Sequence, residues 1–180
     1  MLATNGPAAP WRRAGALGLT FRPIADADRP FLARVYASTR TEELAAVPWT
    51  EEEKAGFLLM QFEAQHTHYQ THYTGADWLV VELAAQPIGR LYIARWPREH
   101  RLIDIALLPE FCGRGFGTAL LCDLVDEARA AGKALTIHVE KNNPAMRLYR
   151  RLGFVPAGEH GVYDLMQWTP AARPQVNTAS

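Results

Sequence analysis

The chain contains a glycine-rich stretch whose backbone could bind a phosphate group. Gly113, Gly115 and Gly117 stand at alternate positions between a predicted strand and a predicted helix. Glycines there let the backbone approach a ligand, and the first N–H groups of the helix would point at it. The helix dipole and the side chain of Arg114 would add attraction for an anion. The alternative is a tight turn in which the glycines serve only geometry, and the glycines alone do not decide between the two.

One setting for such a loop is a dinucleotide-binding unit. The order of strand, glycines, helix and second strand, followed by Glu140, fits that unit, in which an acid binds a ribose hydroxyl. The spacing differs at Thr118, where the third glycine of G-x-G-x-x-G would fall. Three hairpin-linked strands also precede the motif, whereas such a domain usually begins with it. Dinucleotide binding therefore stays a minor alternative.

A second motif follows the second strand and gives the loop a more specific context. The loop and residues 142–154 together closely resemble the GNAT superfamily of N-acetyltransferases. That family has a loop of the form Q/R-x-x-G-x-G/A and, downstream, the pattern N-x-x-A-x-x-L-Y-x-x-x-G-F. The resemblance covers about Leu19 to Trp168, and Cys112 departs from it, because the family usually has Gln or Arg there. The second pattern matches at Asn142, Ala145, Leu148, Tyr149, Gly153 and Phe154.

The resemblance implies that acetyl-CoA binds as co-substrate in a cleft where the fourth and fifth strands separate. Strand backbone would contact the pantetheine arm, and the loop would hold the pyrophosphate mainly through backbone amides. An asparagine would contact the cofactor from the other side, and a tyrosine would lie near the thioester sulfur. The strand residues at the pantetheine arm would be Ile105, Ala106 and Leu107, the asparagine would be Asn142 and the tyrosine would be Tyr149. The loop residues at the pyrophosphate would be Cys112, Gly113, Arg114, Gly115, Phe116, Gly117 and Thr118.

The resemblance also implies direct transfer, in which a neutral primary amine attacks the thioester carbonyl without a covalent enzyme intermediate. The N–H of Leu107 would stabilise the oxyanion, and Tyr149 would protonate the leaving thiolate. We assign the general base to Asp104, because a carboxylate inside an apolar strand needs a partner or a function. Glu140, His138 and a water-mediated path are alternatives for the base. Asp104 could instead pair with an arginine, and Tyr149 could be a core aromatic.

The predicted function is transfer of an acetyl group to a small-molecule or peptide amine. The alternative is a non-catalytic acyl-CoA-binding or sensor domain, which would bind the cofactor through the same loop but catalyse no acetyl transfer. Residues 65–73 hold three histidines and two tyrosines, and could form a wall of the acceptor site. His68 and His72 stand at helical i, i+4 spacing without an acidic ligand, so no metal site is predicted. Plain packing is the simplest interpretation of this segment.

The elements that must position these residues predict an α/β fold with a mixed sheet. A mostly antiparallel meander would feed a parallel βαβ pair, which is also the element order of the GNAT-like acyl-CoA N-acyltransferase fold. We expect a flexible arm over 1–18, a single domain over 19–169 and a tail over 170–180. Strands are predicted at 19–24, 78–83, 88–96, 101–108, 134–139 and within 154–168, and helices after Asp26, from Thr50 to about His66, at 117–131 and at 144–152.

Composition narrows the classes of partner. The 180 residues carry 19 Lys and Arg against 19 Asp and Glu, and this net charge of zero argues against a nucleic-acid partner. Cys112 and Cys122 make neither a disulfide framework nor a zinc set, which favours a reducing compartment and predicts a cytoplasmic protein. The sequence has no apolar run long enough to cross a bilayer, so no membrane partner is predicted. Dimerisation is common in the resembled family, and a homodimer is compatible with it.

Overall fold

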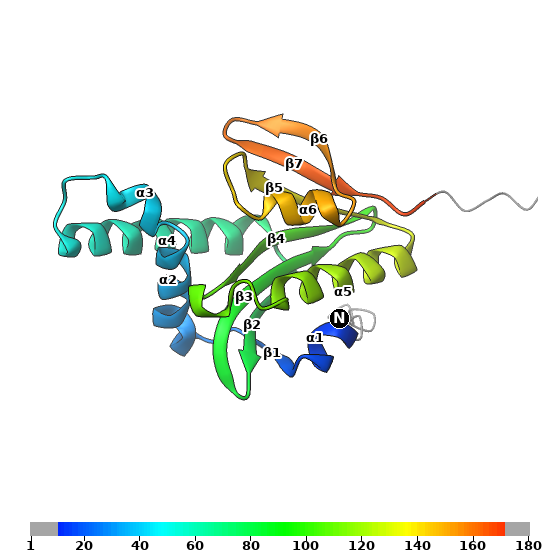
Figure 1. The fold of residues 1–180 in the computed structure, drawn as a ribbon, viewed down its shortest axis with the longest axis horizontal. Helices are drawn as coiled ribbons and strands as arrows, with labels where there is room; N and C mark the ends of the chain where they lie inside the picture. The colour runs from blue at the N-terminus through cyan, green and yellow to red at the C-terminus, as the bar shows by residue number, and fades with distance from the viewer. Residues whose placement is uncertain (1–10, 172–180) are drawn as a thin grey trace, which may run out of the picture.

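The computed structural model describes residues 11–171, which form one sheet flanked by helices (Figure 1). The helices are α1 (Arg12–Ala16), α2 (Arg29–Ser38), α3 (Thr41–Ala45), α4 (Glu51–His72), α5 (Phe116–Ala131) and α6 (Met146–Arg151), with 3₁₀ turns η1 (Asp26–Asp28) and η2 (Pro109–Phe111). The strands are β1 (Leu19–Pro23), β2 (Asp77–Leu83), β3 (Gln86–Arg95), β4 (Glu99–Leu107), β5 (Ala134–Glu140), β6 (Val155–His160) and β7 (Tyr163–Trp168).

The strands form a single mixed sheet with the order β1-β2-β3-β4-β5-β7-β6. Every neighbouring pair is antiparallel except β4 and β5, which run parallel because α5 connects them. The predicted fold class, a meander that feeds a parallel βαβ pair, is therefore confirmed. No helix within residues 11–171 combines the length and the apolar character needed to cross a membrane.

The parallel pair holds together over only part of its length. The pairing of β4 with β5 runs from Glu99 and Ala134 to Leu102 and Ile137 and stops there. At the same point Ile103 has no partner on β3, so β4 contains a bulge. Beyond the bulge β4 stays with β3, whereas β5 stays with β7. The sheet therefore opens between the C-terminal ends of its two central strands.

Each face of the sheet carries its own helices, because successive side chains of a strand point to opposite sides. Leu91 and Ile93 of β3 belong to the main core, which α5 and α6 cover. Tyr92 and Ala94 point the other way, into a cluster closed by Tyr69 of α4. Figure 1 shows α5 along one face of β3 and β4. Side chains from the helices on both faces can therefore contact the opening between β4 and β5.

Helix α4 begins as the sequence predicts and ends later. The Thr50 side chain accepts a hydrogen bond from the N–H of Glu53, and Glu53 binds back to the N–H of Thr50, which completes a capping box. The prediction that helix fades near His66 is wrong, since α4 continues to His72. Its last turns are held by tertiary packing, with Tyr69 edge-on to Tyr92 at 6.4 Å between ring centroids.

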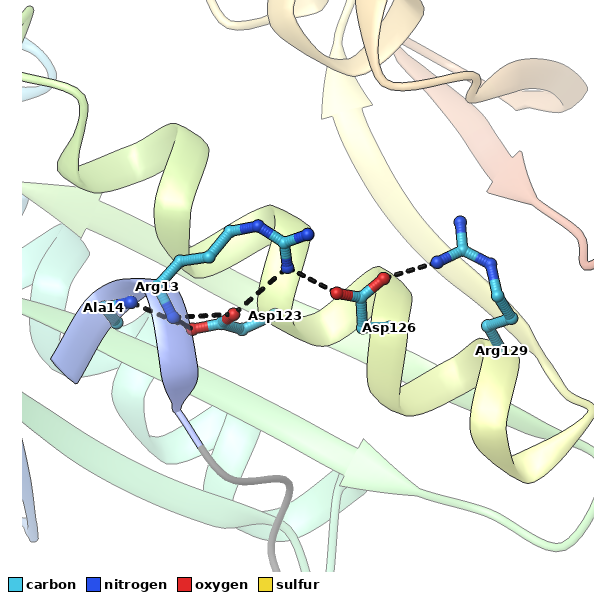
Figure 2. A network of polar contacts seen from close by, with 5 residues as sticks. All are labelled: Arg13, Ala14, Asp123, Asp126 and Arg129. Atoms are coloured by element: carbon cyan, nitrogen blue, oxygen red, sulfur yellow. Dashed lines mark hydrogen bonds and ion pairs between the residues drawn. The ribbon is translucent and has the colours of Figure 1, made fainter. Parts of the chain in front are cut away.

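The predicted flexible arm over 1–18 is wrong where the structure describes it, and residues 1–10 lie outside the described part. Arg12–Ala16 form α1, and Ala14 is fully buried. The carboxylate of Asp123 on α5 accepts the backbone N–H groups of Arg13 and Ala14 at 3.0 Å and caps α1 from another helix (Figure 2). Arg13 also pairs with Asp126, which binds Arg129. Of the predicted tail, the described residues 170 and 171 have no regular structure.

Candidate active site

A cavity of about 150 Å³ lies where β4 and β5 separate. Residues 103–106 of β4 and 137–140 of β5 form its two sides, and Tyr149 reaches it from α6. We call six of its polar and charged lining residues the polar wall. The polar wall consists of Arg40 after α2, Gln65 and Tyr69 of α4, Arg90 of β3, Asp104 of β4 and Glu140 of β5.

The glycine-rich loop presents free backbone amides ahead of α5. Gly113 and Gly115 have positive φ angles of 72° and 84°, which glycine adopts without strain. Among the described residues, none accepts a hydrogen bond from the N–H groups of residues 113–118. Open space surrounds the position that a Cβ would take at Gly113, Gly115 and Gly117. The loop therefore has both the donors and the room that a pyrophosphate requires.

The side chains of the loop leave these amides accessible. The Arg114 guanidinium lies over the rings of Phe111 and Phe116, at 5.5 Å and 5.1 Å from their centroids. Cys112, the departure from the resembled pattern, is exposed, with its Sγ 3.6 Å from the carbonyl oxygens of Leu107 and Leu108. Burial of the sulfur and the nearby Glu110 raise the pKa of the Cys112 thiol, which keeps it uncharged. A neutral thiol at this position neither blocks nor repels an anion.

The three residues predicted to contact the pantetheine arm follow the bulge. Ile105 and Ala106 line the cavity, whereas Leu107 pairs with Gly89 at the end of β4. A Cβ at Gly89 would lie 2.4 Å from the Ala106 oxygen, so only glycine lets β3 approach this closely. Because β4 has lost its contact with β5 here, its second edge is open to an extended ligand.

Tyr149 lies at the border between the core and the cavity. Its side chain is almost completely buried, edge-on to Phe154 at 5.5 Å between ring centroids. Burial, and to a smaller extent the Asp104 carboxylate, raises the pKa of the Tyr149 phenol. The hydroxyl is therefore protonated at neutral pH and can donate a proton into the cavity. Tyr149 is therefore a core aromatic that also lines the cavity.

Asp104 has the arginine partner that the alternative interpretation requires, and it also faces the cavity. Its Oδ2 accepts a hydrogen bond from Arg90 Nη2 at 2.5 Å. Arg90 Nη2 also donates to Gln65 Oε1 at 3.0 Å. The Asp104 side chain keeps 18% of its surface exposed. It follows the bulge at Ile103 directly, so the bulge sets its direction.

The other candidates for the base lie further along the same opening. Glu140 forms an ion pair with Arg40 Nη2 at 2.7 Å and accepts a hydrogen bond from the Tyr163 hydroxyl at 3.3 Å. His138 Nδ1 is 3.3 Å from an Arg101 nitrogen. Burial and the Arg101 charge lower the pKa of His138, so this imidazole is neutral at pH 7. Glu140 joins α2, β5 and β7 at the mouth of the cavity.

The remaining predicted site residue, Asn142, is exposed in the turn after β5 and does not line the cavity. The neighbouring Asn143 does, and its Oδ1 accepts the N–H of Ala145 at 2.8 Å ahead of α6. Thr118, also predicted, is half-buried in the first turn of α5. Of the predicted site residues, Asp104, Ile105, Ala106 and Tyr149 line the cavity, whereas Leu107, the glycine-rich loop and Asn142 do not. The loop follows the unpaired end of β4 in the chain.

The aromatic and histidine segment divides between two sides of α4. Gln65 and Tyr69 face the cavity, and burial together with Asp104 raises the pKa of the Tyr69 phenol. His66 faces a second cavity on the other side of the helix. His68 and His72 stack on each other at 4.0 Å between ring centroids. Within residues 11–171, no group of metal-ligating side chains comes together.

Sequence reasoning missed Arg40 and Arg90, which balance the two carboxylates of the polar wall. Arg90 interrupts an apolar strand, Ile88–Ala94, in the same way that Asp104 interrupts β4. This shared signal could have paired the two residues. Arg40 carries no such signal, since it follows a helix end where arginines are common.

The fold and the opening together define a class of protein that holds an extended, phosphate-bearing ligand between splayed parallel strands. The family model "Acetyltransferase (GNAT) family" matches residues 34–154. The chain belongs to this family of acetyltransferases, which use acetyl-CoA, so the predicted family and co-substrate are confirmed. The free amides of the loop fit that co-substrate.

Three relatives illustrate the similarity. The chain is 32% identical over 98 residues to the N-alpha-acetyltransferase RimI of Mycobacterium tuberculosis, a match that spans 54% of this chain and 58% of that protein. The fold is similar to that of the PaiA N-acetyltransferase of Thermoplasma acidophilum in complex with coenzyme A (16% identity, TM-score 0.63, 84% and 98% of the two chains). It is also similar to that of the ribosomal-protein-S18-alanine N-acetyltransferase of Escherichia coli (20% identity, TM-score 0.58, 88% and 98%).

Proposed function

We propose that the protein transfers the acetyl group of acetyl-CoA to a primary amine by direct attack. The observation that carries the proposal is the single opening between β4 and β5. It joins a loop of free amides to a cavity that holds both a carboxylate and a protonated phenol. The family match removes the ground for a dinucleotide-binding site.

The binding mode follows from where free backbone groups lie. The N–H groups of residues 113–118 would bind the pyrophosphate, with Arg114 and the positive end of α5 adding charge attraction. The open edge of β4 over residues 105–107 would pair with the amides of the pantetheine arm. The acetyl end would then reach the cavity near Tyr149. Asn142 would contact the co-substrate only from outside the cavity.

The transfer requires three proton movements and one oxyanion site. Asp104 takes the proton from the acceptor ammonium, and the amine nitrogen then bonds to the thioester carbonyl carbon. The N–H of Leu107 stabilises the oxyanion, the C–S bond breaks, and the Tyr149 hydroxyl protonates the departing thiolate. The second proton of the attached nitrogen, which is acidic once the nitrogen has bonded to carbon, passes to the Tyr149 phenolate and restores the phenol. Proximity contributes much of the acceleration, because amine and thioester are held in one small cavity. The supporting geometry is that Asp104 comes from β4 whereas Tyr149 comes from α6, so the two side chains approach the opening from different elements.

The charge of the cavity supports an α-amino group as the acceptor. Its lining contains two arginines, Arg40 and Arg90, and two carboxylates, Asp104 and Glu140, so their formal charges cancel. A cavity lining without net charge favours an amine that is easily deprotonated near neutral pH. The α-amino groups of peptides titrate near pH 8, whereas lysine side chains titrate above pH 10. The RimI relative acts on α-amino groups by its name. We therefore propose the N-terminus of a peptide or protein as the acceptor.

A non-catalytic acyl-CoA-binding domain is the second candidate, since Asp104 is held in an ion pair and Cys112 departs from the family pattern. Calorimetric titration with acetyl-CoA, CoA and NADH, followed by thiol release with short peptides, separates the two. Micromolar acetyl-CoA binding with peptide-dependent thiol release is the expected result. Binding without thiol release from any amine would favour the second candidate, and failure to bind acetyl-CoA would overturn both.

We also propose the compartment and the oligomeric state of the enzyme. Cys112 and Cys122 are both free thiols, which supports a reducing compartment such as the cytoplasm. Strand β6, one of the two edge strands of the sheet, is exposed along its whole length, which supports pairing of two copies along it. Light scattering of the purified protein tests the homodimer, with a monomer at working concentration as the contrary outcome.

A further inference from the structure

Arg90 is the most deeply buried charged group of the polar wall. Only 3% of its surface is exposed, although it lies on β3 next to the cavity. Its Nη2 donates to Asp104 and Gln65, its guanidinium lies 5.4 Å from the Tyr92 ring centroid, and its Nε has no hydrogen-bond partner. Burying an arginine with an unpaired nitrogen is costly. Simple packing does not account for a guanidinium at this position.

The partner of Arg90 is placed by the one irregularity of β4. The bulge at Ile103 shifts the register, so Asp104 lies opposite Tyr92 and diagonal to Arg90, whose own partner is Ala106. Asp104 Oδ2 is bound to Arg90, whereas Oδ1 has no hydrogen-bond partner among residues 11–171. One oxygen is therefore fixed and the other remains free on the cavity side.

We propose that Arg90 is a positioning residue for acetyl transfer, which fixes one oxygen of the Asp104 carboxylate and directs the other at the acceptor amine. The inference rests on the proposed role of Asp104 as the base. Arg90 touches neither the acceptor nor the thioester in this arrangement and acts only through Asp104. Gln65 supports it from α4 by binding the same nitrogen of the guanidinium.

The effect of Arg90 on Asp104 can be distinguished from the effects of the other groups around that carboxylate. The titratable and charged side chains that face it from the surrounding elements are Tyr36, Arg40, Tyr69, Arg90, Tyr92, His138, Glu140, Tyr149 and Tyr163. Burial raises the pKa of the Tyr69, Tyr92 and Tyr149 phenols, which are therefore protonated at neutral pH, and Arg40 is already bound to Glu140. Arg90 is the only cation that binds Asp104 directly among the described residues. Loss of Arg90 would therefore leave the Asp104 carboxylate without its direct cationic partner.

The test compares four variants of the full chain by the pH profile of kcat/KM with a short peptide acceptor. Arg90→Met removes the cation, Arg90→Lys keeps it, Asp104→Asn removes the carboxylate, and the double variant Arg90→Met/Asp104→Asn removes both. We expect Arg90→Met to move the acid limb of the profile upward by about one pH unit or more. Arg90→Lys should restore most of the shift. The double variant should equal Asp104→Asn within about twofold, because Arg90 acts through Asp104.

Arg95→Met is the matched control. Arg95 lies on the same strand, is also largely buried and binds Glu127 and Asp77, but it does not line the cavity. Its variant should lose stability and keep the wild-type pH profile. If Arg90→Met does not fold, Arg90→Lys and the charge-free double variant carry the test.

The outcomes separate this inference from the proposed function. A wild-type profile in Arg90→Met, together with strongly reduced activity in Asp104→Asn, would overturn the positioning role and leave the base in place. A double variant much less active than Asp104→Asn would also overturn it, because Arg90 would then act on something else. Full activity in Asp104→Asn would remove the base itself, and the positioning role with it.

Discussion

The glycine-rich loop and the polar wall border the same opening but are built in different ways. The loop is contiguous in sequence and offers backbone amides, so its donors do not depend on side-chain identity. The polar wall gathers side chains from α4, β3, β4, β5 and the end of α2, and each depends on a partner from another element. A backbone site tolerates Cys112 in place of a usual polar residue, whereas a side-chain site should change with single substitutions. The predictions below test this difference.

The largest effect is expected on acetyl-CoA affinity, from a substitution at a glycine of the loop that has a positive φ angle. Gly115→Glu places a carboxylate among the amides that would bind the pyrophosphate and forces a non-glycine residue to a φ of 84°. We expect affinity for acetyl-CoA to fall by about 100-fold or more, through charge repulsion and lost geometry. Isothermal titration calorimetry measures it.

Gly132→Glu is the control for backbone strain alone. Gly132 ends the same helix with a φ of 65°, and a Cβ there would also meet open space. Both variants carry a strain cost of about 1–2 kcal/mol. Only Gly115→Glu should lose acetyl-CoA, and equal affinities in the two variants would contradict the loop assignment.

The second effect separates binding from chemistry. Tyr149→Phe removes one hydroxyl beside the cavity and keeps the packing against Phe154. We expect kcat to fall by about 100-fold, the scale of general acid catalysis, with little change in acetyl-CoA affinity. Steady-state kinetics and calorimetry test this together. Tyr36→Phe is the matched control, because the Tyr36 hydroxyl also borders the cavity but donates to Gln61. Wild-type kcat in Tyr149→Phe would move the acid role elsewhere.

The contrast between loop and wall also explains what the sequence could predict about the site. Strand alternation and glycine positions are local signals, so the mixed sheet and the loop were predictable. The pairing of Arg90 with Asp104 depends on a one-residue bulge in β4, which no local pattern marks. The Arg40–Glu140 pair joins a residue just after α2 to one of β5, and only the completed fold brings these together.

The errors in the predicted fold have the same cause. Composition made residues 11–18 look unstructured, yet Asp123 supplies the cap of α1 from 110 positions away. Likewise, α4 continues past His66 because Tyr69 packs on the sheet. Local propensity is a weak guide wherever a distant residue satisfies the backbone.

The third prediction tests the charge balance of the polar wall. Arg40→Gln frees Glu140 and gives the cavity lining a net negative charge. We expect kcat/KM for a lysine or polyamine acceptor to rise by about three- to tenfold relative to an α-amino peptide, most clearly at low salt. Arg34→Gln, an exposed position of α2 outside the cavity, should leave the ratio unchanged. An unaltered ratio in Arg40→Gln would contradict charge balance as the basis of acceptor choice.

The smallest effect on function is expected at the far side of α5, where α1 docks. Asp123 is buried, and its carboxylate accepts two backbone N–H groups, whereas Asp126 pairs with arginine side chains at the surface (Figure 2). Asp123→Asn should lower the free energy of unfolding by about 1–3 kcal/mol, since it weakens charged hydrogen bonds out of water. Asp126→Asn should stay close to wild type, because exposed ion pairs contribute little. Urea denaturation measures both, and neither variant should change acetyl-CoA affinity or kcat. A loss of affinity in Asp123→Asn would mean that α1 supports the loop through α5, and that the loop depends on side chains after all.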